Sequence, residues 1–314
     1  METAVFFKAI SRAFTVSSTA LEMRLFGSDI RIQWYGVIIA FGFLLAVLFG
    51  GRMAYKWKMN LDKMVDVLIG GTIGGVLGAR LYYVAFHWSS YSGSPLDAAK
   101  IWEGGLAIYG GLIGGLLAAA LVCKIRKLEF RKLLDLAAMS FLIGQGIGRW
   151  GNFTNQEAFG ANTNLPWGMW SEKTAAYIAQ NQGEFSARGI EAVAGTFAEK
   201  AYVHPTFLYE SLWCLLSFAL LYIICRKWHK FDGQLILCYG VLYGAARFFI
   251  EGLRLDSLYI GSTNLRVSQV LSGVLALGCL VALIIILLRI RKKEVAADVR
   301  CFHQEMEGEA IEPA

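Results

Sequence analysis

The sequence predicts an all-α polytopic membrane protein with about seven transmembrane helices and a small extracytoplasmic subdomain. Hydrophobic residues make up 56% of the 314-residue chain and charged residues only 17%, and the mean hydropathy is +0.49. A soluble domain of this length carries more charge. Apolar runs of roughly 17–25 residues are long enough to cross a bilayer as helices. The candidate runs lie near residues 35–51, 65–87, 104–123, 133–150, 208–225, 234–253 and 267–289.

The segments around these runs complete the predicted domain organisation. Residues 1–33 form an N-terminal interfacial segment, in which an amphipathic helix fits residues 4–26. Residues 34–293 form the transmembrane domain. Its one long polar stretch, residues 152–207, is the predicted subdomain and is termed the polar subdomain below. Residues 294–314 are acidic and aperiodic, which indicates a disordered cytoplasmic tail.

Basic residues predict the orientation, because cytoplasmic loops of membrane proteins accumulate lysine and arginine. Basic clusters follow the first, third, fifth and seventh runs, whereas the polar subdomain holds only Lys173, Arg188 and Lys200. This alternation places the N-terminus outside and the C-terminus in the cytoplasm. It also accounts for much of the net charge of +6, which is therefore no evidence for nucleic-acid binding.

Glycines recur at a spacing that favours close helix packing. The pairs are Gly71/Gly75, Gly74/Gly78, Gly110/Gly114, Gly111/Gly115 and Gly144/Gly148. Small residues at this spacing let helix backbones approach closely. Two interpretations stay open: the glycines pack helices together, or the thin helices also leave room for a bulky ligand such as two acyl chains.

Charged residues inside or at the ends of the apolar runs need partners, because each costs roughly 2.5–3.5 kcal/mol on insertion scales. They are Arg80, Asp135, Arg149, Glu210, Arg247 and Glu251. Arg247 and Glu251 share a helix face at i,i+4 spacing and can pair. That pairing leaves Arg80 and Arg149, and a surplus of guanidinium groups favours an anionic headgroup, which arginine holds with two parallel hydrogen bonds. Arg80 can equally bind helix carbonyls.

Arg149 ends the fourth run and is followed by closely spaced hydrogen-bonding residues. Residues 148–160 read GRWGNFTNQEAFG. Lipid hydrocarbon solvates neither a guanidinium nor the backbone of a glycine-broken segment, so both need partners in protein or ligand. The anion that this predicts in a membrane is a lipid phosphate.

Residues 148–160 resemble the signature of the phosphatidylglycerol–prolipoprotein diacylglyceryl transferases of bacterial cytoplasmic membranes. Other motifs agree in order across residues 30–290. They are Trp34-Tyr35-Gly36, Gly78-Ala79-Arg80, residues 104–111, His204-Pro205-Thr206, Leu208-Tyr209-Glu210, and residues 243–247 with Glu251. An ordered set across seven runs is far more specific than one glycine-rich motif.

The resemblance implies the reaction and its partners. The sn-1,2-diacylglyceryl group of phosphatidylglycerol would move to the thiol of a lipobox cysteine in a preprolipoprotein, forming a thioether and releasing glycerol 1-phosphate. The protein would be a multi-pass enzyme of the bacterial cytoplasmic membrane. Its partners would be phosphatidylglycerol, lipobox signal peptides and membrane lipids, and no metal, soluble cofactor or nucleic acid is implied.

The resemblance also implies the site residues. Arg149 would bind the phosphate, and Arg247 would steady it or the leaving glycerol phosphate. The other substrate-binding residues would be Tyr35, Arg80, Asn152, Glu157, Gly160, His204, Tyr243 and Glu251. For the tyrosines, anchoring at the membrane interface is the alternative role.

The group that removes the thiol proton is open, because many family members have histidine at the position of Tyr109. The candidates are Tyr109 itself, His204, or the positive field of the site alone. His204 can instead cap the start of the following helix. We favour a catalytic role for Tyr109 in positioning or proton relay.

Two other classes of protein share some of these features. A transporter or channel for an anionic substrate is the alternative function, because it also uses intramembrane arginines and broken glycine-rich helices. The sequence shows no internal repeat to favour it. A structural membrane scaffold would tolerate neutral residues at Arg149 and Arg247.

Overall fold

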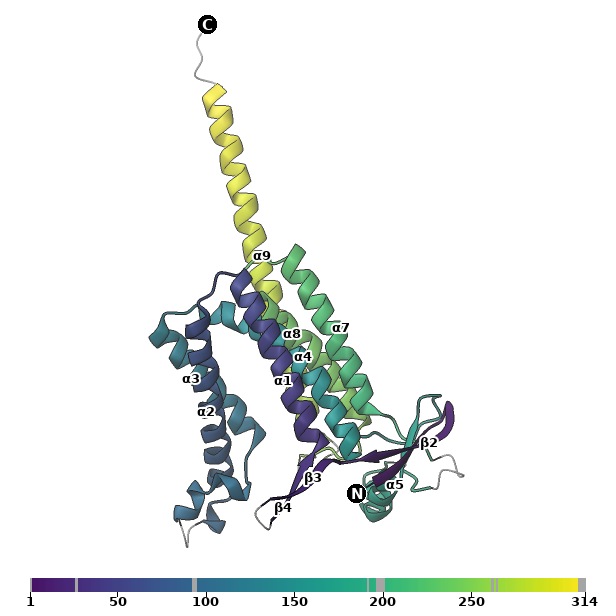
Figure 1. The fold of residues 1–314 in the computed structure, drawn as a ribbon. Helices are drawn as coiled ribbons and strands as arrows, with labels where there is room; N and C mark the ends of the chain where they lie inside the picture. The colour runs from purple at the N-terminus through teal and green to yellow at the C-terminus, as the bar shows by residue number, and fades with distance from the viewer. Residues whose placement is uncertain are drawn as a thin grey trace. The chain divides into compact units, whose positions relative to one another are not determined.

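The computed structural model describes residues 2–25, 28–91, 95–190, 192–195, 201–260, 263 and 265–309. The chain divides into two compact units, which are termed the large unit (Met1–Ala46 with Ala138–Ala314) and the small unit (Val47–Ala137). Long helices are the main elements of both units, as Figure 1 shows.

Six of the described helices are long and apolar enough to cross a membrane. They are α1 (Trp34–Lys56), α2 (Leu61–Phe86), α3 (Ile108–Arg126), α7 (Thr206–Lys227), α8 (Gln234–Leu253) and the part of α9 within Val267–Lys293. Many of their large apolar side chains are exposed, as expected where lipid is the surrounding solvent. The predicted polytopic helical architecture is confirmed.

The fourth predicted run is also helical, but it is less apolar than the other six. It forms α4 (Phe130–Asn155), whose sequence is interrupted by Asp135, Gln145 and Arg149. Met139 and Leu142 of α4 are fully buried, so this helix packs against protein. A seventh membrane span therefore stays a prediction.

The N-terminal segment contains strands, so the prediction of an amphipathic helix over residues 4–26 is wrong. The strands are β1 (Glu2–Phe7), β2 (Ile10–Ser17), β3 (Thr19–Leu25) and β4 (Ser28–Gln33). Apolar and polar residues alternate in β3 and β4, a period of two that fits strands and not a helix. In this antiparallel hairpin Glu22 lies opposite Arg31, and Arg24 lies opposite Asp29.

Strand β1 pairs with a strand of the polar subdomain. It lies between β2 and β5 (Met169–Ser171) in an antiparallel sheet of order β2-β1-β5. Helices α5 (Glu172–Gln180) and α6 (Gln182–Ala187) follow β5, at the same end of the large unit as the sheet (Figure 1). The sheet and these helices share one hydrophobic core, which contains Val5, Phe159, Met169, Ile178, Phe185, Ala192, Val203, Phe207 and Leu255. The N-terminal strand therefore completes the core of a segment that lies far along the chain.

Helix α9 runs from Val267 to Glu309, so the predicted disordered tail from residue 294 is wrong for the described backbone. Once a helix has nucleated, each added residue gains a hydrogen bond at low cost. The tail consists largely of good helix formers such as alanine, glutamate, glutamine and methionine, with glycine only at Gly308. The acidic composition alone was a poor guide to its conformation.

In the small unit, α2 and α3 lie side by side (Figure 1), and the glycines of the two helices are in contact. A Cβ added to Gly78 would lie 2.4 Å from the Gly110 carbonyl oxygen, and one added to Gly114 would lie 2.3 Å from the Gly74 carbonyl oxygen. No side chain fits between the backbones at these positions. The packing interpretation of these glycine pairs is confirmed.

Candidate active site

Arg149 of α4 and Arg247 of α8 meet at one carboxylate, that of Glu210 in α7. Arg149 Nη2 lies 2.5 Å from Glu210 Oε2, and Arg247 Nη1 pairs with the other oxygen, Glu210 Oε1. The three helices lie together in the large unit (Figure 1). Charged residues from three distant parts of the sequence thus form one ion-pair network.

Glu251 extends this network along α8. Arg247 Nη2 lies 2.6 Å from Glu251 Oε2, which confirms the predicted i,i+4 pair. The Glu210 and Glu251 side chains are 4% and 3% exposed, whereas those of Arg149 and Arg247 are 20% and 15% exposed. The two arginines are therefore the part of the network that a ligand can contact. Two guanidiniums face two carboxylates, so the predicted surplus of positive charge is wrong here, because Glu210 serves both arginines.

The signature segment continues the network beyond α4. Arg149 Nη1 donates to Asn152 Oδ1 at 3.4 Å, and Asn152 Nδ2 donates to Glu157 Oε1 at 2.9 Å. The chain turns back after α4 through Gln156 and Ala158, whose φ angles of 52° and 56° lie in the left-handed region. This turn returns Glu157 to Asn152, where the Glu157 amide donates to the Asn152 carbonyl at 3.0 Å.

Both predicted tyrosines lie near the C-terminal part of α4. Tyr35 packs its ring on Gly151 of α4, where an added Cβ would lie 2.8 Å from ring atom Cδ2. Tyr243 lies near enough to Arg149 to interact with it electrostatically, and its ring stacks on that of Tyr239 with centroids 5.4 Å apart. Tyr35 is 38% exposed, so interfacial anchoring stays open for it.

Gly160 and His204 lie together where the polar subdomain meets the end of α8. The Gly160 amide donates to the His204 carbonyl at 2.9 Å, and Gly160 also forms a β-bridge with Arg254. A Cβ added to Gly160 would lie 2.8 Å from His204 Cβ and 2.9 Å from the Leu253 carbonyl oxygen. Only glycine allows these segments to approach so closely.

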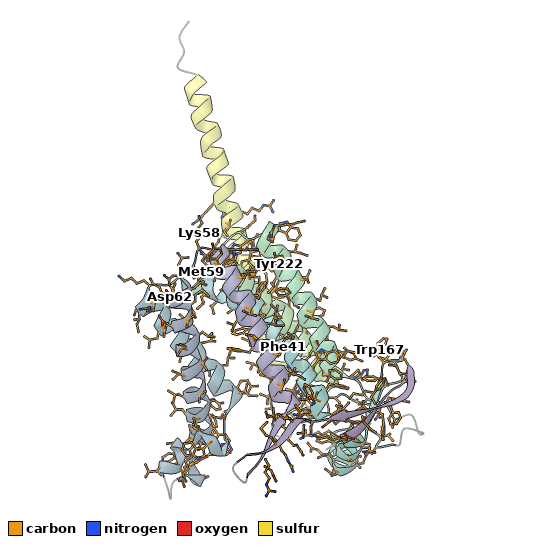
Figure 2. All side chains as sticks on the ribbon, in the orientation of Figure 1. Phe41, Lys58, Met59, Asp62, Trp167 and Tyr222 are labelled. Atoms are coloured by element: carbon orange, nitrogen blue, oxygen red, sulfur yellow. The ribbon has the colours of Figure 1, made fainter. Side chains whose placement is uncertain are left out.

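The imidazole of His204 contacts Tyr209. Its Nδ1 lies 3.0 Å from the Tyr209 hydroxyl, which accepts a hydrogen bond from the Trp167 indole at 2.8 Å. An indole is only a donor, so the hydroxyl can donate its own hydrogen to neutral His204. Helix α7 begins after Pro205 without a side-chain cap, so the capping role for His204 is wrong. Figure 2 shows Trp167 beside one end of α7 and Tyr222 near the other.

Burial lowers the pKa of His204 below its usual range, which predicts a pH dependence of stability. Between the folded pKa and the unfolded pKa of about 6.5 the unfolded state binds more protons, so stability falls as pH decreases through this window. Thermal unfolding in detergent at pH 7 and pH 5 measures the loss. His204→Gln should lose less stability over this interval than the wild type, and an equal loss would contradict the assignment.

Arg80 binds backbone carbonyls in the small unit. Its Nε donates to Ala98 at 2.8 Å, its Nη2 to Asp97 at 2.9 Å, and its Nη1 to Gly104 and Gly105 at 2.6 and 3.2 Å. Both glycines have positive φ angles, which orient their carbonyls toward the guanidinium. The side chain is buried. These contacts favour the carbonyl-binding role over substrate binding.

Replacing Arg80 by methionine should destabilise the loop of residues 88–107. Each hydrogen bond to a charged donor contributes roughly 1.5–3 kcal/mol, and the carbonyls would lose their donor. We expect a lower unfolding temperature and faster protease cleavage within the loop. An unchanged unfolding temperature together with weaker phosphatidylglycerol binding would assign Arg80 to the substrate instead.

Tyr109 is the second residue of α3, directly after the loop that Arg80 holds. The Ala107 amide donates to the Ala79 carbonyl of α2 at 3.1 Å, which fixes the start of α3. Tyr109 and Arg80 belong to the small unit, and the arginine network belongs to the large unit. The role of Tyr109 in proton transfer stays a prediction.

Three residues near the network received no site role from the sequence. Glu210 is the central one, and its acidic side chain inside an apolar run was the available signal. Arg254 forms two hydrogen bonds with Asp256, at 2.9 and 2.8 Å, and Arg266 donates to the Glu251 carbonyl. Arg254 and Arg266 lie outside the apolar runs, where an arginine carries no comparable signal.

Comparisons with known proteins identify similar chains. The model of the family described as prolipoprotein diacylglyceryl transferase matches residues 23–285, which include the whole arginine–glutamate network. Three similar curated proteins are all named phosphatidylglycerol–prolipoprotein diacylglyceryl transferase. The protein of Finegoldia magna is 38% identical over 274 residues, 87% of this chain and 96% of the relative. That of Listeria innocua is 44% identical over 78% and 82% of the two chains, and that of Trichormus variabilis is 42% identical over 77% and 81%.

Proposed function

The chain belongs to the prolipoprotein diacylglyceryl transferase family, and we propose that Arg149 and Arg247 hold the phosphate of phosphatidylglycerol while the diacylglyceryl group is transferred. The protein is a multi-pass membrane enzyme that transfers this group from phosphatidylglycerol to a prolipoprotein. The acceptor in this proposal is the lipobox cysteine of the signal peptide. The products are a thioether and glycerol 1-phosphate.

The chemistry explains why two arginines are needed. Sulfur forms a bond to the glyceryl carbon as the bond from that carbon to the phosphate oxygen breaks, so negative charge gathers on the departing phosphate. Guanidinium groups bind phosphate through parallel charged hydrogen bonds and stabilise such a charge. The observation that carries the proposal is the convergence of Arg149 and Arg247, from α4 and α8, on Glu210.

The other residues support these two arginines. Asn152 and Glu157 orient Arg149 through their hydrogen bonds, and Glu251 orients Arg247. Tyr243, which interacts with Arg149, and Tyr35, which packs on Gly151, are the proposed hydroxyl partners of glycerol or phosphate oxygens. Gly160 and His204 position elements of the site through their contacts with each other and with the end of α8. A positioning or proton-relay role for Tyr109 stays a prediction.

The apolar helices and the pattern of basic residues support a location and an orientation of the enzyme in the membrane. We place it in the bacterial cytoplasmic membrane, with the N-terminus and the polar subdomain outside and α9 ending in the cytoplasm. The exposed apolar faces of the spans then contact membrane lipids. In this orientation the site lies at the extracytoplasmic end of α7, because Glu210 is in the second turn of that helix.

A direct transfer assay tests the function. Purified protein is incubated with a lipobox peptide and vesicles that contain phosphatidylglycerol, and the peptide mass is followed together with glycerol 1-phosphate release. We expect the mass of one diacylglyceryl group to be added. A peptide with serine in place of the lipobox cysteine, and vesicles of phosphatidylcholine alone, should give no product. Transfer from phosphatidylcholine at the same rate would contradict recognition of the glycerol phosphate headgroup.

A further inference from the structure

The arginine network is already neutral before any lipid binds. Arg149 and Arg247 are matched by Glu210 and Glu251, and Arg254 is matched by Asp256. At the edges of the network, Glu157 and Arg266 add one charge of each sign. A phosphodiester brings one more negative charge. An excess charge in a largely buried network is costly, and proteins commonly avoid it by binding a proton.

Glu210 occupies the nitrogen atoms that a bridging phosphate would use. Its two carboxylate oxygens contact one guanidinium each, Arg149 Nη2 and Arg247 Nη1. Glu251 contacts Arg247 alone, through the other terminal nitrogen. A phosphate that binds both arginines therefore displaces Glu210 and can leave the pair of Arg247 and Glu251 in place.

The neighbours of Glu210 restrict where a proton can go. Arg149 from α4 and Arg247 from α8 pair with it directly, and Tyr243 of α8, Arg254 beyond α8 and Cys214 one turn along α7 are near enough to interact with it electrostatically. The arginines already carry their protons, and a tyrosine or thiol is neutral with its proton bound. None of these neighbours can take up a further proton, whereas a displaced carboxylate can.

We propose that Glu210 is the general base of the transfer, released by the lipid phosphate to take the proton of the acceptor thiol. This inference rests on the proposed function. The phosphate takes the place of the Glu210 carboxylate on the two arginines, and the freed carboxylate accepts the thiol proton. The thiolate forms the carbon–sulfur bond as the carbon–oxygen bond to the phosphate breaks. Glu210 then returns its proton to the departing glycerol phosphate and pairs with the arginines again.

Counting protons by isothermal titration calorimetry tests this exchange. The purified protein is titrated with short-chain phosphatidylglycerol, without acceptor peptide, in buffers of different ionisation enthalpy. Because no thiol is present, solvent supplies the proton, and we expect the wild type to take up close to one proton for each lipid bound. With the acceptor peptide bound beforehand, the thiol supplies the proton and the uptake should disappear. Glu210→Gln should bind the lipid without proton uptake. Glu184→Gln, which alters an exposed carboxylate outside the network, should retain the uptake.

The outcomes separate this inference from the proposed function. Lipid binding by the wild type without proton uptake, or unchanged uptake in Glu210→Gln, overturns the role of Glu210. Absence of phosphatidylglycerol binding to the wild type contradicts the proposed function itself. Because the wild-type measurement alone can overturn the inference, the test does not depend on the folding of a variant.

Kinetics provide a second readout that a structural role would not produce. Glu210→Gln should lower kcat by about 10²–10⁴-fold, the usual contribution of a general base, while KM for phosphatidylglycerol is unchanged or lower. The loss of a glutamate that only positions the arginines would also weaken binding of the lipid phosphate, so KM would rise together with the fall in kcat. Glu184→Gln, which alters an exposed partner of Arg188, should keep the wild-type rate. An unchanged kcat in Glu210→Gln overturns the proposal.

Discussion

Replacing Arg149 by lysine should lower the rate of diacylglyceryl transfer by about 10²–10³-fold, the loss expected when one preorganised donor to a developing charge is removed. Arg149 contacts Glu210 and Asn152 through different nitrogens of one planar group. A lysine ammonium is a single point of charge on a flexible stem and cannot reproduce this fork. The measurement is kcat with phosphatidylglycerol vesicles and a lipobox peptide.

Alanine at Arg149 should have the larger effect, because the buried Glu210 would keep only Arg247. Breaking a buried ion pair costs about 3–5 kcal/mol, so the unfolding temperature should fall as well as the rate. The lysine variant keeps a positive charge and isolates the chemical effect. Comparing the two variants separates the loss of the phosphate contact from the loss of stability.

Arg188 is a matched control for Arg149. Its side chain is 21% exposed, against 20% for Arg149, and it also pairs with one glutamate, Glu184 at 3.1 Å. It lies in α6's C-terminal cap and not in the network. Arg188→Lys should therefore transfer at the wild-type rate. Wild-type transfer by Arg149→Lys would mean that bidentate recognition at this position is not required.

Charge inside an apolar run is the part of the site that the sequence predicts well. A charged side chain in hydrocarbon needs a partner, so Arg149, Arg247 and Glu251 can be selected from hydropathy and charge alone. The i,i+4 pair of Arg247 and Glu251 follows from helix geometry. The sharing of Glu210 by both arginines does not follow from helix geometry. It depends on how α4, α7 and α8 face one another, and the spacing of residues within one helix does not predict how separate helices pack.

The N-terminal strands and the polar subdomain show a similar limit. The six spans follow from hydropathy, which is a local property of the chain. The burial of Val5 depends on pairing of β1 with β5, more than 150 residues later, and this contact has no local signal. The apolar side chains around Val5 also fit an interfacial helix, because a membrane surface would cover them. The polar subdomain covers Val5 instead.

Adding one methyl group at Gly114 should force α2 and α3 apart. The Cβ of an alanine there would lie 2.3 Å from the Gly74 carbonyl oxygen and 2.8 Å from Gly78 Cα. Both are backbone atoms of α2, so neither can rotate away and the helices themselves must move. Overpacking of this kind costs typically about 1–3 kcal/mol. We expect Gly114→Ala to lower the unfolding temperature in detergent and Gly114→Val to lower it further.

Two other glycines separate the effect of close approach from that of glycine itself. Gly115 is less crowded, since its added Cβ would lie 3.3 Å from the Gly71 carbonyl oxygen, and at Gly278 in α9 nothing lies within 4 Å. Alanine favours a helix over glycine by about 1 kcal/mol, so Gly278→Ala should leave the unfolding temperature unchanged or raise it. Stability should therefore decrease from Gly278→Ala through Gly115→Ala to Gly114→Ala. If all three variants unfold at the same temperature, the close backbone contact does not stabilise the pairing of α2 and α3. The glycines would then be explained better by the space that they leave for acyl chains.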